Sequence, residues 1–202
     1  EEATACDELG QLTPKTHAIL RDSGIIRIFQ PTEYGGLEGD PVEFARLIMD
    51  LASNAPSAGW VCGVVGLHSF EFAQTDPRLQ EEVWGKDVNT WTASPYAMFG
   101  RATRVEGGWR LSGRWPFSSG TDYCDWAVVG GMTEAEPGSG EFTEPHHFII
   151  QIPHRQSRAI RKKIDNAGIK WHVARNIVFH QTDRLVQSRS YPEFKKYIRI
   201  KR

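Results

Sequence analysis

The sequence is poor in cysteine and contains no long apolar run. Its 202 residues include three cysteines, which are odd in number, widely spaced and without a CxxC pair, and this argues against a disulfide framework and against a zinc site. No stretch approaches the roughly 18 apolar residues of a transmembrane helix, and no secretory signal opens the sequence. We therefore expect a cytoplasmic protein with no membrane partner. The sequence does have 40% hydrophobic residues, enough for a packed core.

The charges are nearly balanced in number but not in position. Residues 158–202 hold 13 Lys and Arg against 3 Asp and Glu, so the rest of the chain is acidic. A basic segment can bind nucleic acid or acidic lipid, but this one contains no recognition motif and no repeat. We therefore expect no nucleic-acid partner, and we interpret residues 158–202 as a basic, divergent tail that is either exposed to solvent or misassembled.

Capping signals divide the first part of the chain into helices. Thr13 and Asp40 are N-cap residues followed directly by proline, and Gly24 stands where a helix would end. Apolar residues of the second helix recur at helical spacing, at Phe44, Leu47, Ile48 and Leu51. Together these signals predict an N-terminal helical domain, residues 1–87, with helices over 12–23, 41–53, 56–74 and 77–84.

From about residue 90 the period of the sequence changes toward two. The pattern predicts strands over 90–97, 101–107, 109–115, 125–131 and 146–153. The turn-rich run TEAEPGSGEFTEP, residues 133–145, predicts a surface loop. Helices followed by an antiparallel sheet is an α+β order. We therefore expect a middle antiparallel β-domain over residues 88–157, packed against the helical domain.

The segment GGWRLSGRWPFSSGTDYCDWAVV, residues 107–129, is the most informative in the chain. Aromatic and β-branched residues flank the small cluster Ser118-Ser119-Gly120, which predicts two strands joined by a polar turn. The hydroxyls and amides of such a turn are free to hold a ligand. The segment resembles the flavin-contacting motif of the acyl-CoA dehydrogenase superfamily, and its Ser-Ser-Gly version resembles the branch that hydroxylates rather than desaturates.

Five further segments extend this resemblance, and they occur in the family's order: RDSGIIRIFQPTEYGGLEGDP, LASNAPSAGW, VVGLHSF, RLQEEVWG and SPYAMFG. Over about residues 20–153 the chain is similar to the oxygenase components of two-component flavin-dependent aromatic monooxygenases, such as those acting on 4-hydroxyphenylacetate and on a phenolic seco-steroid. The resemblance implies hydroxylation of a small phenolic or other aromatic substrate with O₂. It also implies reduced flavin, FMNH₂ or FADH₂, supplied by a separate flavin reductase.

The family also has a C-terminal helical bundle, through which it forms a homotetramer. After residue 153 the resemblance weakens: Trp171-His172-Val173-Ala174 still resembles a family strand, but the glycine-rich loop that should follow is missing. Nothing in the basic tail corresponds to that bundle. We therefore expect a truncated form in which the bundle is absent, and with it the segment through which the family forms its tetramer. Two rival interpretations stay open: an acyl-CoA dehydrogenase, whose catalytic glutamate usually lies in the bundle, and a non-catalytic flavin- or partner-binding fragment.

The predicted helix over 56–74 carries a stripe of chemically useful residues. Trp60, Val64 and His68 lie at i, i+4 and i+8, so they share one face and the outer two are about 12 Å apart. From the residues alone, His68 beside Leu67 and Phe70 fits a core histidine better than a catalytic one. The resemblance reverses this, because the family places a histidine of this segment beside the substrate phenol. His68 is then the catalytic group that accepts or stabilises the charge of the phenolate.

Three glycines of the same helix allow two interpretations. Gly59, Gly63 and Gly66 each weaken a helix by up to about 1 kcal/mol relative to alanine. Such a cost is explained if a large ligand approaches the backbone, or if another helix packs closely against it. The two explanations fit the sequence equally well.

The resemblance also assigns the residues that hold the flavin. Ser119 is in addition assigned a catalytic role, as a hydrogen-bond donor beside the reacting part of the ring. Seven residues are expected to bind the cofactor: Trp60, Ser94, Pro95, Tyr96, Phe117, Ser118 and Ser119.

No metal is expected. His146 and His147 are adjacent on a predicted strand, where neighbouring side chains point to opposite faces, so they do not share a metal ion. The histidines other than His68 are interpreted as surface or packing residues: His17, His146, His147, His154, His172 and His180.

Overall fold

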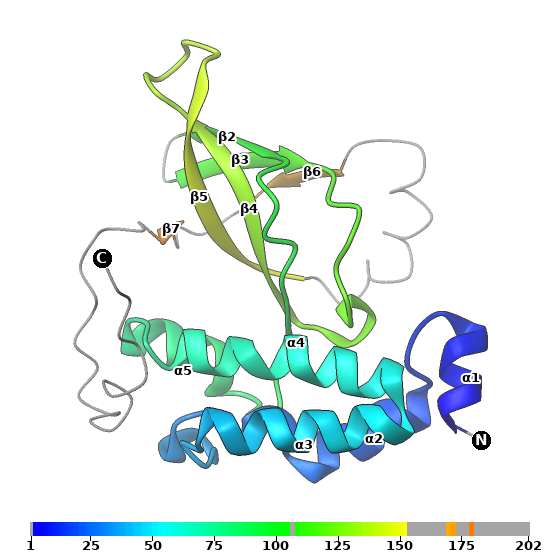
Figure 1. The fold of residues 1–202 in the computed structure, drawn as a ribbon. Helices are drawn as coiled ribbons and strands as arrows, with labels where there is room; N and C mark the ends of the chain where they lie inside the picture. Colours follow the sequence, from blue (N-terminus) through cyan, green and yellow to red (C-terminus); the bar gives the residue numbers. More distant parts are fainter. Residues whose placement is uncertain (1, 106–107, 153–168, 173–177, 180–202) are drawn as a thin grey trace, which may run out of the picture.

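The computed structural model describes residues 2–105, 108–152, 169–172 and 178–179. Helices come first along the chain and strands follow (Figure 1). The helices are α1 (Glu2–Leu9), α2 (Pro14–Ser23), α3 (Pro41–Asn54), α4 (Pro56–Phe72) and α5 (Pro77–Trp84). The strands are β1 (Thr92–Ala93), β2 (Gly100–Val105), β3 (Gly108–Gly113), β4 (Trp126–Glu134), β5 (Phe142–Gln151), β6 (Ile169–His172) and β7 (Val178–Phe179).

The predicted helices are confirmed with boundaries that differ by at most two residues, and capping contacts explain where they begin and end. The hydroxyl of Thr13 accepts a hydrogen bond from the backbone N–H of Thr16 at 3.0 Å, and the carboxylate of Asp40 accepts from the first turn of α3. Gly24 ends α2 in the left-handed conformation, with φ of 72°, which a residue without Cβ adopts at little cost. Helix α1 was not predicted, because no capping pair precedes it.

The sheet is mixed rather than antiparallel, which corrects the expectation. The strand order is β6-β3-β2-β4-β5-β7, with β1 also paired to β4. Strands β1 and β2 run parallel to β4, whereas the pairs β2–β3, β3–β6, β4–β5 and β5–β7 are antiparallel. The reason is that β4 pairs with β2 and not with β3. Each turn reverses the chain, so the second reversal brings β4 back into the direction of β2.

The predicted loop over 133–145 is shorter than expected. Strand β4 continues to Glu134 and β5 begins at Phe142, and Thr133 still pairs with Glu144. Only residues 135–141 connect the two strands. At both ends of the run, backbone pairing between β4 and β5 prevails over the local preference of these residues for turns. A register shift beside Thr133 and Glu134 accommodates the extra residue.

Helix α4 lies between α3 and the sheet (Figure 1). Its three glycines face α3: a Cβ on Gly59 would lie 2.6 Å from Cβ of Ala52, and one on Gly66 would lie 2.7 Å from the ring of Phe44. Close helix packing therefore explains these glycines, and the interpretation as a place of ligand approach is wrong.

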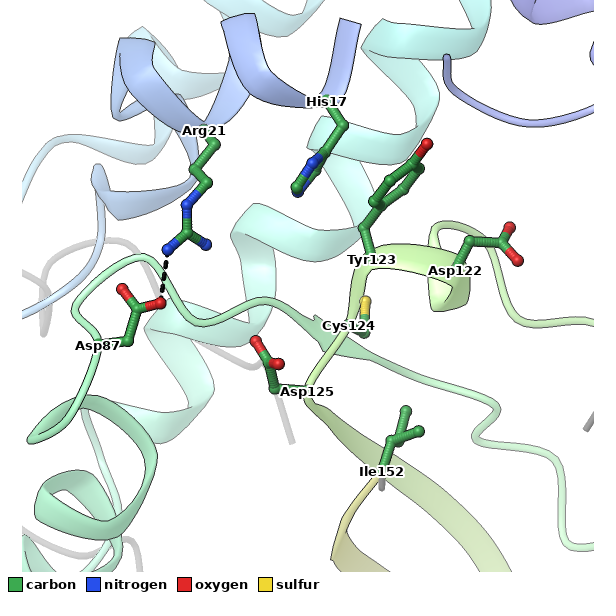
Figure 2. A pocket seen from close by; sticks show the side chains of 8 residues that line it. All are labelled: His17, Arg21, Asp87, Asp122, Tyr123, Cys124, Asp125 and Ile152. Atoms are coloured by element: carbon green, nitrogen blue, oxygen red, sulfur yellow. Dashed lines mark hydrogen bonds and ion pairs between the residues drawn. The ribbon is translucent and has the colours of Figure 1, made fainter. Parts of the chain in front are cut away.

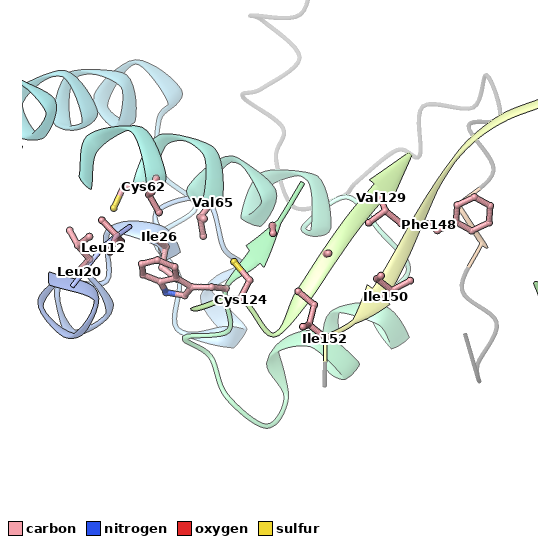
Figure 3. Packing of buried hydrophobic residues seen from close by; sticks show 14 of the residues in the cluster. Leu12, Leu20, Ile26, Cys62, Val65, Cys124, Val129, Phe148, Ile150 and Ile152 are labelled. Carbon is pink, nitrogen blue, oxygen red and sulfur yellow. The ribbon is translucent and has the colours of Figure 1, made fainter. Parts of the chain in front are cut away.

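The opposite side of α4 builds the main core with the strands (Figure 3). Cys62 and Val65 of the helix are buried in one cluster with Val129 and Phe148 of the strands. Among the described residues, no helix is long and apolar enough to cross a membrane.

Candidate functional site

One end of α4 meets the serine-glycine turn. The indole N–H of Trp60 donates a hydrogen bond to the hydroxyl oxygen of Ser119 at 2.9 Å. Gly120 packs the turn onto the helix, since a Cβ there would lie 2.9 Å from Val61. The rings of Trp60 and Phe117 nevertheless remain 67% and 85% exposed. The turn therefore presents two apolar rings and one hydroxyl at the surface, a combination suited to a flat heteroaromatic ligand.

A tryptophan connects the two segments that were predicted to contact flavin. The indole N–H of Trp115 lies 3.0 Å from the carbonyl oxygen of Ala97 and 2.9 Å from that of Gly130. The backbone N–H of Gly130 in turn donates to the carbonyl of Pro95 at 3.0 Å. Residues 94–99 and 114–120 are thus fixed to the same point of β4. Trp115 belongs to the flavin-contacting motif predicted from the sequence, but its anchoring role was not predicted.

The remaining predicted flavin residues differ in the burial and hydrogen bonding of their side chains. Ser94 is half-buried and Pro95 is buried. Ser118 is engaged within its own turn, because the hydroxyl of Thr121 donates to its carbonyl oxygen at 2.7 Å and also lies within hydrogen-bond distance of its hydroxyl. Ser119 is the serine of the turn whose hydroxyl reaches α4. The structure therefore brings Trp60, Phe117 and Ser119 together and gives Ser118 a local role.

Two turns along α4, His68 forms a hydrogen-bonded cluster. Its Nδ1 lies 2.8 Å from Oε2 of Glu71 and 3.0 Å from the hydroxyl oxygen of Tyr96. The Tyr96 hydroxyl also donates to the Glu71 carboxylate, at 2.7 Å from Oε1 and 2.5 Å from Oε2. Tyr96 comes from the segment after β1, so the cluster joins α4 to the second predicted flavin segment. We call these three residues the His68 cluster.

Burial within the His68 cluster is uneven. The His68 side chain is 3% exposed, whereas that of Glu71 is 48% exposed and Tyr96 is 37% exposed. Nε2 of His68 is buried and has no hydrogen-bond partner among the described residues. Buried polar atoms without a partner are rare in folded proteins, so Nε2 is the ring nitrogen whose hydrogen-bonding capacity the described residues leave unused.

The cluster also shifts the pKa values of its members. Burial alone would raise the pKa of Glu71, but the hydrogen bonds from His68 and Tyr96 outweigh it and the pKa is lowered. Burial raises the pKa of Tyr96, and the neighbouring charge of Glu71 raises it further. At neutral pH Glu71 is therefore ionised and Tyr96 keeps its proton. Sequence reasoning missed Glu71, although its i+3 spacing from His68 was the available signal.

Three other histidines, His17, His146 and His147, lie against aromatic rings. The His147 ring lies 5.1 Å from that of Tyr96, and His17 stacks on Tyr123 at 4.0 Å. The prediction that His17 is a packing residue is thus confirmed, while His154 and His180 lie outside the described residues. In the part of the chain that the structure describes, no group of three His, Cys, Asp or Glu side chains is arranged to hold a metal ion.

A polar cavity of about 350 Å³ lies elsewhere, between α2 and the start of β4 (Figure 2). Arg21 reaches across it to form an ion pair with Asp87. None of the predicted flavin or substrate residues lines this cavity. Its lining residues are His17, Arg21, Asp87, Asp122, Tyr123, Cys124, Asp125 and Ile152.

The chain is similar to hydroxylases of known sequence, although no protein-family model matches it. A pigment production hydroxylase from Rhodococcus erythropolis is 40% identical over 177 residues, which are 88% of this chain and 45% of the relative. A match of that length runs past residue 153, where the resemblance noticed in the sequence weakened. The oxygenase component of p-hydroxyphenylacetate 3-hydroxylase from Acinetobacter baumannii is 35% identical over 130 residues, 64% of this chain and 31% of the relative.

Solved structures agree with the sequence relatives. The HsaA monooxygenase from Mycobacterium tuberculosis superposes with a TM-score of 0.68 at 38% identity, over 74% of this chain and 39% of that one. The chain thus spans less than half the length of the proteins it matches. By sequence and by fold, its homologues are the oxygenase components of two-component flavin-dependent monooxygenases, which have the acyl-CoA dehydrogenase-like fold.

Proposed function

We propose that this chain forms the helical and β part of an oxygenase component that hydroxylates a small phenolic substrate with reduced flavin and O₂. One observation carries the proposal. Helix α4 presents Trp60 and His68 on one stripe, and each is hydrogen-bonded to a different segment that resembles a flavin-contacting motif. One helix face thereby places a ring-binding end and an acid–base end about 12 Å apart.

The exposed rings and the Ser119 hydroxyl, whose own proton can still be donated, are suited to the flavin. Trp60 and Phe117 offer apolar faces and Ser119 offers a hydroxyl. The neighbouring segment contributes Ser94, Pro95 and Tyr96. Ser118 supports the turn through Thr121. Reduced flavin, when bound, supplies the reaction with O₂. The protein's own contribution is to hold the ring flat against these groups and to keep water from it.

His68 acts on the substrate. A phenol has a pKa near 10 and is mostly neutral at pH 7, whereas an electrophilic oxygen attacks the electron-rich phenolate more readily. An imidazole nitrogen that lacks a partner inside the protein can accept the proton of the substrate hydroxyl. His68 Nε2 is such a nitrogen.

The wider setting follows from the same proposal. Reduced flavin comes from a separate reductase, as in a two-component system. Residues 1–87 form the helical domain, 88–157 the flavin-contacting β-domain and 158–202 the basic tail. Cys6, Cys62 and Cys124 are buried free thiols, which suits a reducing, cytoplasmic location.

The test uses the oxygenase as its gene encodes it, with reductase, O₂ and a panel of phenols. His68→Ala should lower product formation about 10²-fold, the usual contribution of an acid–base group, and raise hydrogen peroxide release. Affinity for reduced flavin, measured by anaerobic titration, should be unchanged and higher than for oxidised flavin. Undiminished hydroxylation by the variant would refute the role of His68, and equal affinity for the two flavin redox states would refute the two-component assignment.

A further inference from the structure

We infer that Glu71 is a positioning residue: its carboxylate keeps the proton of the imidazole on Nδ1 of His68 and so leaves Nε2 as the nitrogen that accepts the substrate's proton. This inference rests on the proposed function, in which His68 is the base. It adds a residue outside the segments that resemble the flavin contacts, and it specifies which ring nitrogen reacts.

The tautomer follows from counting donors and acceptors. An ionised carboxylate only accepts hydrogen bonds, so the contact of 2.8 Å between Glu71 Oε2 and His68 Nδ1 requires the proton on Nδ1. The Tyr96 hydroxyl has one proton, and its contacts of 2.7 and 2.5 Å with the Glu71 oxygens use it. The Tyr96 oxygen is then left to accept from the same Nδ1–H at 3.0 Å. One proton arrangement satisfies all four contacts.

The arrangement is held by rigid parts of the fold. His68 and Glu71 lie at i and i+3 on α4, where side chains are neighbours. Tyr96 follows a segment that is anchored to Gly130 of β4. The His68 ring is 3% exposed, so it has little room to turn over and exchange its nitrogens. In a neutral imidazole with Nδ1 protonated, Nε2 is an acceptor, and it is the atom that the protein leaves without a partner.

Hydrogen bonds from His68 and Tyr96 lower the pKa of Glu71 and keep its carboxylate ionised at neutral pH. The groups that face it are His68 on its own helix, Tyr96 from the segment after β1 and His147 from β5. The Tyr96 proton is retained, since burial and Glu71 both raise its pKa. At neutral pH the carboxylate is therefore an acceptor for both neighbours.

The first experiment reads the tautomer without any reaction. The 202-residue chain is labelled with ¹⁵N-histidine, and long-range ¹H–¹⁵N spectra report which ring nitrogen carries the proton; a His68→Gln sample identifies the His68 signals. We expect Nδ1–H in the unmodified chain. Glu71→Gln should shift the population to Nε2–H, because the amide can donate to Nδ1. Nε2–H in the unmodified chain would overturn the inference even if the variant does not fold.

The second experiment separates positioning from a general structural role. In the complete oxygenase, Glu71→Gln should lower hydroxylation of a phenol of pKa near 10 by about 10²-fold. With a nitrophenol that is already ionised at pH 7, the same variant should lose less than about threefold, since no proton has to be accepted. Equal losses with both phenols would make Glu71 merely structural and overturn the inference.

A matched control and the His68 variant complete the design. Glu81 also accepts a hydrogen bond from a tyrosine, the hydroxyl of Tyr34 at 3.3 Å, but lies on α5 outside the His68 cluster. Glu81→Gln should leave both activities and the His68 signals unchanged, and a change in either would count against the inference. If His68→Ala leaves hydroxylation intact while the tautomer is as inferred, the proposed function fails and the positioning contact remains.

Discussion

The α3–α4 contact allows a quantitative test of why α4 contains glycine. We consider Gly59→Ala and Gly63→Ala, two substitutions of the same chemistry on the same helix face. The added Cβ at position 59 would lie 2.6 Å from Cβ and 2.7 Å from Cα of Ala52, while at position 63 the nearest atom is the Cγ2 methyl of Ile48 at 3.3 Å. The first contact is far too short and involves backbone, whereas the second is a side-chain contact that is too short by only a few tenths of an ångström.

Two free energies set the outcome. Replacing glycine by alanine inside a helix gains up to about 1 kcal/mol in helix propensity. Overpacking a tight contact costs about 1–3 kcal/mol. At Gly63 a shift of a few tenths of an ångström relieves the contact, so the propensity gain prevails and stability rises slightly. At Gly59 the helices have to separate, so we expect a net loss of about 1–2 kcal/mol.

Urea unfolding of the two variants measures the difference. With a slope of about 2 kcal/mol per molar urea, a loss of this size moves the midpoint of Gly59→Ala down by about 0.5–1 M. The midpoint of Gly63→Ala should stay or rise. Because Trp60 follows Gly59 directly, its fluorescence should also report a disturbed contact with Ser119 in the first variant only. Equal midpoints for the two variants would refute the packing explanation.

Three further outcomes are expected. Burial raises the pKa of Cys62 to about 12, so at pH 8 its thiol should resist alkylation in the folded chain and react once urea is added; mass spectrometry measures both, and rapid labelling of the folded chain would contradict the burial. The pKa of Glu71 is lowered in the folded state, so its stabilising contribution is present above its unfolded pKa of about 4.5 and is lost as the pH falls through the folded value; the unmodified chain should lose more stability across that acidic range than Glu71→Gln, and parallel curves would count against the coupling. Finally, a Cβ on Gly130 would lie 1.9 Å from the Tyr96 carbonyl oxygen, so Gly130→Ala should lower the melting temperature and release residues 94–99, with a cost of about 3 kcal/mol or more; an unchanged melting temperature would show that this segment is not held on β4.

The sequence alone determined the features that depend on near neighbours. Helices α2, α3 and α5 begin directly after Thr13, Asp40 and Asp76, because the side chain of each of these N-cap residues accepts from a backbone amide two or three residues on. Alternation over a few residues predicted the places of β2 to β5, whereas only Thr92–Ala93 of the predicted strand 90–97 forms a strand and β6 and β7 were not predicted. The family resemblance is also a property of short motifs, and the comparisons confirmed it.

Features that join distant segments were decided only by the tertiary structure. Nothing in the alternation of β2 shows that it pairs with β4 in parallel, because pairing is set by where the second turn returns the chain. Glycine at position 59 lowers helix stability by the same amount whether it faces a ligand or α3. Only the position of Ala52 distinguishes these two explanations. Glu71 gained its role when the segment after β1 brought Tyr96 to the same carboxylate. Local spacing limits which side chains share a face, but the partner on that face is chosen by long-range packing.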